Sequence, residues 1–226
     1  MCGRITLTTA PEIVAEVFGL STVPFLSPRY NIAPSQLIPI VRLRGDPPRP
    51  ELEAVRWGLV PTWAKDASIG HRMINARAET LAEKPAFRAA FRSRRCLVVA
   101  DGFYEWRQGP QRKQPSLIRR RDQRPFAIAG LWESWLDADR APLLTCTIVT
   151  TEANPLMAPI HERMPALIDA AAYRTWMDPF ARPGDLVSLL SPCADETLEA
   201  FAVSARVNNP KYDDAECLEP LAPTDA

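Results

Sequence analysis

The chain has 226 residues, of which 46% are hydrophobic and 24% charged, a composition typical of globular proteins and outside the disordered range. Its 27 basic and 27 acidic side chains give a net charge of zero, which argues against a basic nucleic-acid coat protein and an acidic solvating tail. No apolar run approaches the roughly 18 to 20 residues that span a bilayer, and no leader opens the chain. We therefore expect a soluble, cytoplasmic protein.

Local sequence patterns predict many short strands and a few short helices. In chain order, the predicted elements are a helix over 11–19, strands near 36–43 and 52–60, a helix over 79–92, strands near 95–104, 126–132 and 143–150, a helix over 170–177 and a strand near 201–207. Segments rich in Pro and Gly at 45–50 and 109–115 predict surface turns. The 23 prolines limit long helices, and no segment resembles a long linker. The fold class predicted is α+β, a single domain with a mainly antiparallel β-sheet core.

The zero net charge hides an asymmetry along the chain. Residues 1–130 carry 21 basic and 11 acidic side chains, whereas residues 131–226 carry 6 basic and 16 acidic ones. Only four of the 27 basic residues are lysines, and the planar guanidinium of arginine suits bidentate contacts to phosphate. Arginine used simply to solvate the surface explains the same counts. Both interpretations stay open at this point.

The five cysteines do not form a disulfide framework or a metal motif. They lie at Cys2, Cys96, Cys146, Cys193 and Cys217, an odd number without a CxxC pair. This pattern fits a reducing compartment and argues against a cysteine-based zinc site, so we expect no metal. Cys96 and Cys146 lie in apolar, strand-like runs, where a free thiol packs as a small hydrophobic group.

Cys2 differs from the other cysteines because it follows the initiator Met1, which is removed efficiently before a small residue. A chain that begins at Cys2 carries an amine and a thiol on adjacent carbons, and its α-amine has an ordinary pKa of roughly 7.7–8.0. An aldehyde condenses with such an amine to an imine, on which the thiol closes to give a thiazolidine. Alternatively the thiol is the nucleophile and the amine its base, as in N-terminal-nucleophile hydrolases. An incidental cysteine at the terminus is the third interpretation.

Three polar residues elsewhere are candidates for proton transfer or positioning. Asn75 follows an apolar pair of residues, and Glu105 ends an apolar strand among aromatic side chains, where desolvation favours a general acid or base. His161 is one of only two histidines and lies beside Arg163 in a segment bounded by prolines. Taken one at a time, a strand-end glutamate paired with arginine and a structural histidine explain the same residues.

Eight segments in order along nearly the whole chain carry a family resemblance. They are Met1-Cys2-Gly3-Arg4, Tyr30-Asn31-Ile32-Ala33-Pro34, Arg56-Trp57-Gly58-Leu59-Val60-Pro61-Thr62-Trp63, Asn75-Ala76-Arg77-Ala78-Glu79-Thr80, Arg94 to Trp106, Ala129-Gly130-Leu131-Trp132-Glu133, Thr147-Ile148-Val149-Thr150 and His161-Glu162-Arg163-Met164-Pro165. Val203-Ser204 and Val207-Asn208-Asn209 add a closing motif. Together they resemble the SOS-response-associated peptidase (SRAP) family of abasic-site-processing proteins. The resemblance implies a barrel-like SRAP fold over residues 2–222.

The resemblance implies a sensor of abasic sites in single-stranded DNA that acts in DNA damage repair and the SOS response. Carried over residue by residue, Cys2 is the crosslinking nucleophile, Asn75 the positioning group, and Glu105 and His161 the acid/base pair. The product is a covalent thiazolidine linkage between protein and DNA, with lyase, self-reversal and autoproteolytic activity in addition. The abasic sugar opens in part to an aldehyde, which is the group that the amine and thiol of Cys2 require.

The resemblance also implies the residues that contact DNA. Arg4, Arg77 and Arg163 would hold phosphates around the lesion, while Trp63 and Trp106 would stack on neighbouring bases. Stacking of a base on an aromatic ring contributes about 1–3 kcal/mol and needs no particular sequence. Packing in the core is the alternative role for the two tryptophans.

Two other functions share parts of this pattern. Glutamine amidotransferases also open with Met-Cys-Gly, although their other glutamine-site motifs are not found here. A thiol peptidase built from cysteine, histidine and asparagine is the other alternative, and we expect proteolysis to be confined to removal of Met1. We expect a monomer that uses no cofactor and associates with the nucleoid during DNA damage.

Overall fold

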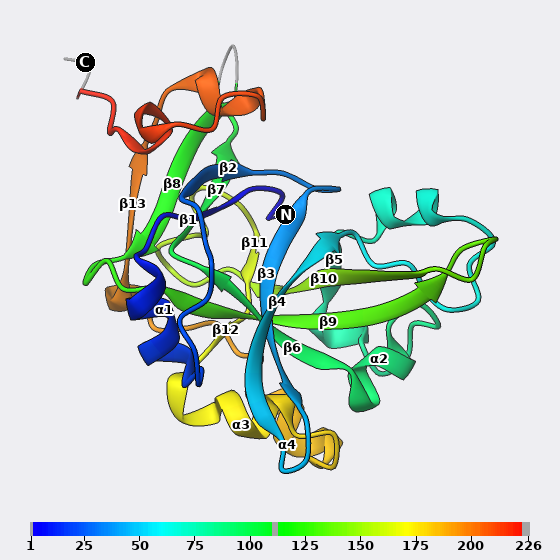
Figure 1. Ribbon diagram of the computed structural model, residues 1–226. Coiled ribbons are helices and arrows are strands. Elements are labelled where there is room, and N and C mark those ends of the chain that lie inside the picture. The colour runs from blue at the N-terminus through cyan, green and yellow to red at the C-terminus, as the bar shows by residue number, and fades with distance from the viewer. Residues whose placement is uncertain (1, 110–112, 223–226) are drawn as a thin grey trace.

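Five strands close into a barrel at the centre of the molecule, which is described here from a computed structural model of residues 2–109 and 113–222 (Figure 1). The strands are β3 (Leu37–Arg44), β4 (Arg49–Trp57), β6 (Arg95–Ala100), β9 (Phe126–Leu136) and β10 (Pro142–Glu152). Hydrogen-bonded pairs run β4–β3–β6–β9–β10, and β10 returns to β4 through a parallel pairing. The other four pairings are antiparallel. The fold class is therefore confirmed, with a closed barrel as its core.

A second antiparallel sheet lies against the barrel and contains the start of the chain. In spatial order its strands are β13 (Leu198–Ala202), β8 (Gln114–Arg120), β7 (Gly102–Arg107), β1 (Ile5–Leu7) and β2 (Arg29–Ile32). β6 of the barrel continues into β7 of this sheet with only Asp101 between them. The Asp101 carboxylate accepts hydrogen bonds from the Thr6 hydroxyl at 2.5 Å and the Thr9 N–H at 2.8 Å. The first strand is thereby tied to the junction of the two sheets.

Short elements complete the fold around these sheets. β5 (Asn75–Arg77) pairs in parallel with β10, β11 (Arg163–Pro165) pairs with β10, and β12 (Leu167–Ile168) pairs with β9. The helices are α1 (Pro11–Phe18), α2 (Arg88–Ser93), α3 (Tyr173–Met177) and α4 (Pro183–Ser188). The 3₁₀ helices are η1 (Ala67–Arg72), η2 (Ala78–Thr80), η3 (Ala170–Ala172), η4 (Asp195–Thr197), η5 (Ala205–Asn208) and η6 (Ala215–Leu218). No helix in the described ranges is long and apolar enough to cross a membrane.

Two apolar clusters hold the layers together. The first joins barrel strands to the helices through Phe18, Phe91 and Trp176. The second lies between barrel strands and the second antiparallel sheet. It contains Trp57 and Cys2, and neither side chain has any exposed surface. Because burial of apolar area contributes roughly 25 cal/mol per Å², both clusters stabilise the packing of β elements that are distant in sequence. The second residue of the chain is thus part of the core.

Three sequence predictions of local structure are wrong, the first being the single strand near 95–104, which is divided at Asp101 into β6 and β7. The helix predicted over 79–92 is helical only in η2 and α2, because Pro85 between them has no N–H to continue a helix. The strand predicted near 201–207 ends at Ala202, because the Ser204 hydroxyl accepts a hydrogen bond from the Arg206 N–H at 3.2 Å and begins η5. The domain bounds 2–222 stay a prediction. Met1 and part of the turn predicted over 109–115 lie outside the described residues.

Candidate functional site

Cys2 is buried because the strand that follows it is paired on both sides. β1 lies between β2 and β7, with Ile5 opposite both Ile32 and Phe103. The Tyr104 N–H donates to the carbonyl oxygen of Arg4 at 3.0 Å, so the pairing continues toward the terminus beyond the assigned strand. Residue 2 is therefore held by backbone pairing and apolar packing. A terminus that is merely incidental to the fold would not be placed in this way.

The environment of the Cys2 thiol keeps it protonated near neutral pH. Burial raises the pKa of this thiol to about 12, and the negative charge of Glu105 acts in the same direction. The thiol donates to the carbonyl oxygen of Arg4 at 3.9 Å. The thiol must therefore transfer its proton to a base in the step in which it reacts.

Asn75 holds the backbone of Cys2 from the neighbouring sheet. β5 places Asn75 opposite Ile148 of β10, and the Trp57 indole N–H donates to the carbonyl oxygen of Ile74 at 2.9 Å. The Asn75 side-chain amide donates to the carbonyl oxygen of Cys2 at 2.7 Å. Its Oδ1 atom is buried and accepts no hydrogen bond within the described part of the chain. Asn75 therefore fixes residue 2 with its donor and keeps an acceptor beside it.

Glu105 is a buried carboxylate on the strand next to Cys2. It is 3% exposed and follows Tyr104, the residue whose N–H bonds to the Arg4 carbonyl. The Trp106 N–H donates to Glu105 Oε1 at 3.3 Å. The charge of Glu105 contributes to the raised pKa of the Cys2 thiol, which shows that the two groups interact. A buried carboxylate beside a protonated thiol is a suitable group for accepting and returning protons.

His161 lies in the loop between β10 and β11, and its hydrogen bonds assign its tautomer. The backbone N–H of His161 donates to the carbonyl oxygen of Met157 at 2.9 Å. The imidazole Nδ1 accepts from the backbone N–H of Arg163 at 3.0 Å. A backbone N–H can only donate, so Nδ1 carries the lone pair and Nε2 carries the proton. Ile160 and Met164 on either side belong to the apolar cluster that contains Cys2. The loop is thereby packed on the core that buries the thiol.

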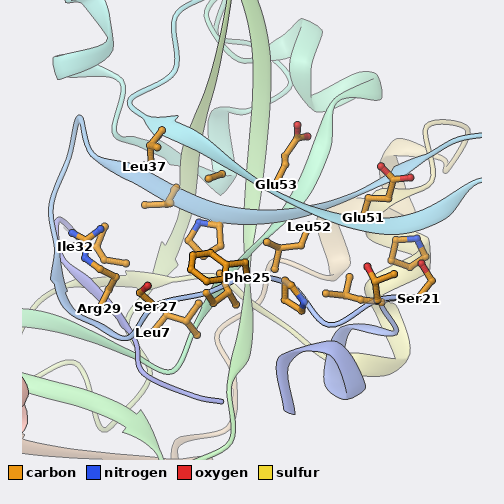
Figure 2. A pocket seen from close by; sticks show the side chains of 18 residues that line it. Leu7, Ser21, Phe25, Ser27, Arg29, Ile32, Leu37, Glu51, Leu52 and Glu53 are labelled. Atoms are coloured by element: carbon orange, nitrogen blue, oxygen red, sulfur yellow. The ribbon is translucent and has the colours of Figure 1, made fainter. Parts of the chain in front are cut away.

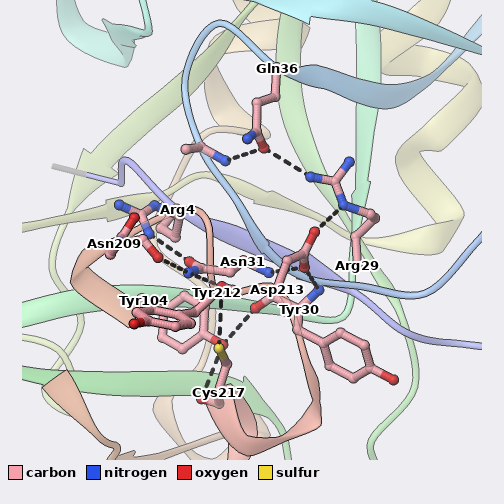
Figure 3. A network of polar contacts seen from close by, with 11 residues as sticks. Arg4, Arg29, Tyr30, Asn31, Gln36, Tyr104, Asn209, Tyr212, Asp213 and Cys217 are labelled. Atoms are coloured by element: carbon pink, nitrogen blue, oxygen red, sulfur yellow. Dashed lines mark hydrogen bonds and ion pairs between the residues drawn. The ribbon is translucent and has the colours of Figure 1, made fainter. Parts of the chain in front are cut away.

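Arg4 binds the C-terminal segment of the chain. Its Nη1 donates to Asn31 Oδ1 at 2.6 Å, as Figure 3 shows. The same atom donates to the carbonyl oxygen of Val207. Asn31 in turn donates to the carbonyl oxygen of Tyr212 at 2.7 Å. The Arg4 guanidinium carbon lies 5.8 Å from the centre of the Trp106 ring. Sequence reasoning assigned no role to Asn31, although the residue stands in a quoted motif, and its role in the fold is to join the chain's two ends.

Arg163 is also bound within the protein. Its guanidinium forms a bidentate pair with the Glu79 carboxylate, at 2.6 Å and 3.0 Å, and donates to the carbonyl oxygen of Thr150 at 2.7 Å. The hydrogen bonds from Arg163 lower the pKa of Glu79. Sequence reasoning gave Glu79 no role. Its position two residues after Arg77 in the Asn75–Thr80 segment was the available signal.

Trp63, Arg77 and Trp106 have surface that a ligand can reach. Trp63 is 58% exposed, and Arg77 is exposed without a hydrogen bond or ion pair to the described residues. Trp106 is half-buried, and its indole N–H donates to Asn208 Oδ1 at 2.7 Å. The Trp135 indole N–H donates to the carbonyl oxygen of Ala64 at 2.8 Å, which anchors the loop beside Trp63.

A close approach of two backbone segments shapes the loop that carries Trp63. Gly58 has a φ angle of +121°, and a Cβ atom there would lie 2.6 Å from the carbonyl oxygen of Gly70. Only glycine combines this backbone angle with this contact. The Gly58 in the motif quoted above therefore allows the chain to turn from the barrel into the loop.

A polar pocket lies beside the segment of His161, and larger pockets lie elsewhere in the described part of the chain. The polar pocket has a volume of about 520 Å³, and its lining includes Arg77, Glu152, Glu162 and Arg163. A larger pocket of about 640 Å³ lies between the 20–29 segment and the β3–β4 hairpin (Figure 2) and is lined by none of the predicted site residues. Among the described residues, no three His, Cys, Asp or Glu side chains are grouped to hold a metal ion.

Folding brings the basic and acidic parts of the chain together. Arg94 pairs with Glu133 at 2.8 Å and Arg119 pairs with Glu199 at 2.7 Å, and both pairs join one part of the chain to the other. Such pairs neutralise some of the excess charge that each part carries. Arg77, which lines the polar pocket, forms no ion pair with the described residues, so its positive charge is exposed there.

The fold and the site together define a class of protein: a closed β-barrel with a buried thiol at residue 2, held by an amide and faced by a carboxylate. The model of the family described as SOS response associated peptidase (SRAP) matches residues 1–210. The chain belongs to this family, as the sequence motifs predicted.

Two curated relatives and one solved structure illustrate the likeness. The abasic site processing protein YoqW of Bacillus subtilis is 44% identical, over 97% of this chain and 99% of that protein. The abasic site processing protein HMCES of Xenopus tropicalis is 30% identical, over 96% of this chain and 78% of that protein. A crystal structure of a protein from Bacteroides thetaiotaomicron is 27% identical with a TM-score of 0.87, covering 98% of this chain and 100% of that one.

Proposed function

We propose that this protein processes abasic sites in single-stranded DNA and captures the lesion covalently through Cys2. The observation that carries the proposal is the hydrogen bond from the Asn75 amide to the carbonyl oxygen of Cys2, beside the buried Glu105. It fixes the backbone of residue 2, an aminothiol once Met1 is removed, at the edge of the apolar core. Relatives named abasic site processing proteins, 44% and 30% identical, support abasic-site processing in general.

The proposed reaction has two bond-forming steps. The α-amine of Cys2 attacks the carbonyl carbon of the ring-opened sugar, and loss of water leaves an imine. The thiol sulfur then adds to the imine carbon, and its proton passes to the nitrogen, which closes a five-membered thiazolidine. The raised pKa of the thiol, about 12, favours this order, because the amine loses its proton near neutral pH and the thiol does not.

Each polar group has a proton or a position to control in this scheme. Glu105 accepts the proton of the attacking amine and returns one to the departing water. His161, with its proton on Nε2, donates to the ring oxygen of the sugar as it opens. The Oδ1 atom of Asn75, which accepts no hydrogen bond from the described residues, receives one from the amine or a sugar hydroxyl.

The proposed DNA contacts fall into two groups. Trp63 and Trp106 stack on bases beside the lesion, and Arg77 binds a phosphate, since these three side chains have accessible surface. Arg4 and Arg163, also predicted to bind phosphate, donate to protein groups in this structure and shape the site around the lesion. A nucleotide without a base enters such a site most easily from an unpaired strand.

Covalent capture is tested by intact mass and a denaturing gel. Wild-type protein is expected to lack Met1 and to gain the mass of an abasic oligonucleotide less one water. Cys2→Ala abolishes the heat-stable adduct, whereas Cys193→Ala, a change at a half-buried cysteine remote from Cys2 in sequence, leaves it intact. An adduct that persists in Cys2→Ala refutes the assignment of the nucleophile.

We further propose that lyase and self-reversal activities use the same site and that any peptidase activity is confined to removal of Met1. The buried, protonated thiol of Cys2 supports this restriction, because a cysteine peptidase attacks with a thiolate of lowered pKa. Release of glutamate from glutamine by the purified protein would instead favour the amidotransferase alternative.

A further inference from the structure

An ion pair connects the two segments that carry Asn75 and His161. Glu79 lies in η2, directly after β5, and Arg163 opens β11, directly after the loop of His161. Both Nη atoms of Arg163 donate to the Glu79 carboxylate, at 2.6 Å and 3.0 Å. A bidentate pair of this kind fixes orientation as well as distance. Both segments also pair with β10, and the ion pair adds a side-chain link between them.

The Arg163 side chain has little freedom left once this pair has formed. Nη2 also donates to the carbonyl oxygen of Thr150 at 2.7 Å, and the side chain is only 10% exposed. Glu79 is 46% exposed, so its carboxylate approaches the arginine from the solvent side. Without Glu79, Thr150 would remain the hydrogen-bond partner of the guanidinium among the described residues. A largely buried cation would then lack its counter-charge.

The backbone of Arg163 in turn holds His161. Its N–H donates to Nδ1 of the imidazole at 3.0 Å and so favours the tautomer with the proton on Nε2. β11 has only three residues and lies at the end of its sheet, paired with β10 alone. Strand pairing over so short a segment restrains it weakly, so the anchored side chain of Arg163 contributes to the placement of its own N–H.

We propose that Glu79 is a positioning residue, which holds Arg163 so that the Arg163 N–H keeps His161 in the tautomer that donates from Nε2. The inference rests on the proposed function for its consequence in catalysis. Its structural content, that Glu79 controls the tautomer of His161, stands apart from any reaction. The two parts are tested separately.

The kinetic test separates binding from chemistry. The DNA probe for binding is a single strand with a tetrahydrofuran abasic analogue, which has no aldehyde and cannot form the adduct. Glu79→Ala and Glu79→Gln are expected to bind this probe as tightly as wild type or more tightly, because a negative charge is lost. With a saturating natural abasic strand, the same variants are expected to form the adduct about 10- to 100-fold more slowly. This factor is smaller than the roughly 10²- to 10⁴-fold that a general acid contributes, because only the positioning of His161 is disturbed.

Glu152 supplies the matched control. It lines the same polar pocket, is exposed, and makes no side-chain hydrogen bond or ion pair to the described residues. Glu152→Gln removes the same charge from the same pocket without changing Arg163, so we expect an unchanged rate of adduct formation. An equal slowing in Glu152→Gln and Glu79→Gln would show that pocket charge is responsible, and it would overturn the inference.

The tautomer is observed directly by NMR of the imidazole nitrogens. The chain has two histidines, and His71→Ala assigns the signals of His161. We expect the wild type to show a protonated Nε2 and an unprotonated Nδ1, and Glu79→Ala to show averaging between tautomers. An unchanged spectrum in Glu79→Ala overturns the inference. If the wild type forms the adduct, an equal rate of adduct formation in Glu79→Ala also overturns it. Absence of an adduct in the wild type refutes the proposed function alone, because the NMR result is independent of it.

Discussion

The hydrogen bond from Asn75 to Cys2 offers the sharpest test of the site. Asn75→Ala removes the donor at 2.7 Å and leaves the carbonyl oxygen of Cys2 without it in a buried setting. Loss of one partner of a buried hydrogen bond costs about 1–3 kcal/mol. If about 1–2 kcal/mol of that loss raises the activation free energy of the attack by the amine, adduct formation slows by about 5- to 30-fold.

Asn75→Asp should be more damaging than Asn75→Ala, although it is closer in shape. The carboxylate has no hydrogen to donate, so one of its oxygens would face the carbonyl oxygen of Cys2 at the distance where the amide now donates. Repulsion between the two oxygens is added to the loss of the bond. The order of rates expected is wild type, then Asn75→Ala, then Asn75→Asp.

The assay is the single-turnover rate of adduct formation on an abasic strand, followed on a denaturing gel with the protein in excess. Asn209→Ala is the control, because the Asn209 side chain accepts from the Lys211 N–H at 3.1 Å and contacts none of the proposed reacting groups. Thermal unfolding accompanies each rate, since a loss of 1–2 kcal/mol lowers Tm by about 2–8 °C at this chain length. A folded Asn75→Ala that reacts at the wild-type rate, or an Asn75→Asp that reacts faster than Asn75→Ala, refutes the reasoning.

Three further predictions concern DNA binding and stability. Trp63→Ala weakens binding to single-stranded DNA by about 5- to 150-fold, the loss of one stacked base, whereas Phe180→Ala, which removes another exposed aromatic ring, has no effect in a titration. Arg77→Ala lowers the slope of log K against log salt by about 0.7 for one phosphate contact, and Arg88→Ala, an exposed arginine on α2, leaves it unchanged. The stability advantage of wild type over Cys2→Ala, measured by chemical denaturation, shrinks as the pH rises above 9.0 toward 12.

The direction of the last effect follows from the raised pKa of the Cys2 thiol. Its pKa is about 12 in the folded protein against 9.0 as the ordinary value, so the thiol ionises in the unfolded chain first. The contribution to stability is complete below pH 9 and is lost as the pH rises toward 12, by about 1.4 kcal/mol per pH unit. A constant difference between the two proteins across this range would contradict the burial of an intact thiol.

Equal weakening by Trp63→Ala and Phe180→Ala would assign the effect to the general loss of exposed aromatic surface. An unchanged salt slope in Arg77→Ala would show that Arg77 points away from the phosphates. In each pair the two substitutions remove the same kind of group, so only the position of the side chain can separate their results.

The sequence predicted secondary structure correctly where residues close together along the chain determine it. Stretches rich in β-branched and other apolar residues predicted the strands of the barrel, and helical spacing of apolar residues predicted α1. The prediction over 79–92 failed, since apolar spacing does not register that Pro85 lacks an N–H. The long strand predicted at 95–104 is divided at Asp101, whose carboxylate binds residues of β1.

The partners of charged side chains could not be predicted in the same way. Arg4 donates to the carbonyl oxygen of Val207, and Arg163 donates to the carboxylate of Glu79, both distant in sequence. Both arginine side chains are largely buried. Glu79 and Asn31 had no predicted role, because their partners come from segments 84 and 27 residues away along the chain. The pairing of a charge depends on which strands lie side by side, and sequence spacing does not contain that information.

The sequence by itself determined the α+β class and the family, because local patterns and motifs along the chain carry both. It also predicts an aminothiol at residue 2 once Met1 is removed, because an amine and a thiol on adjacent carbons are a property of one residue. Tertiary structure alone decided that Cys2 is buried, that Asn75 reaches its carbonyl, and that the thiol has a pKa of about 12. These properties require β1 to lie between β2 and β7, and β5 to lie beside β10. Long-range strand pairing brings together groups that sequence order separates, and the environment of the thiol arises from that pairing.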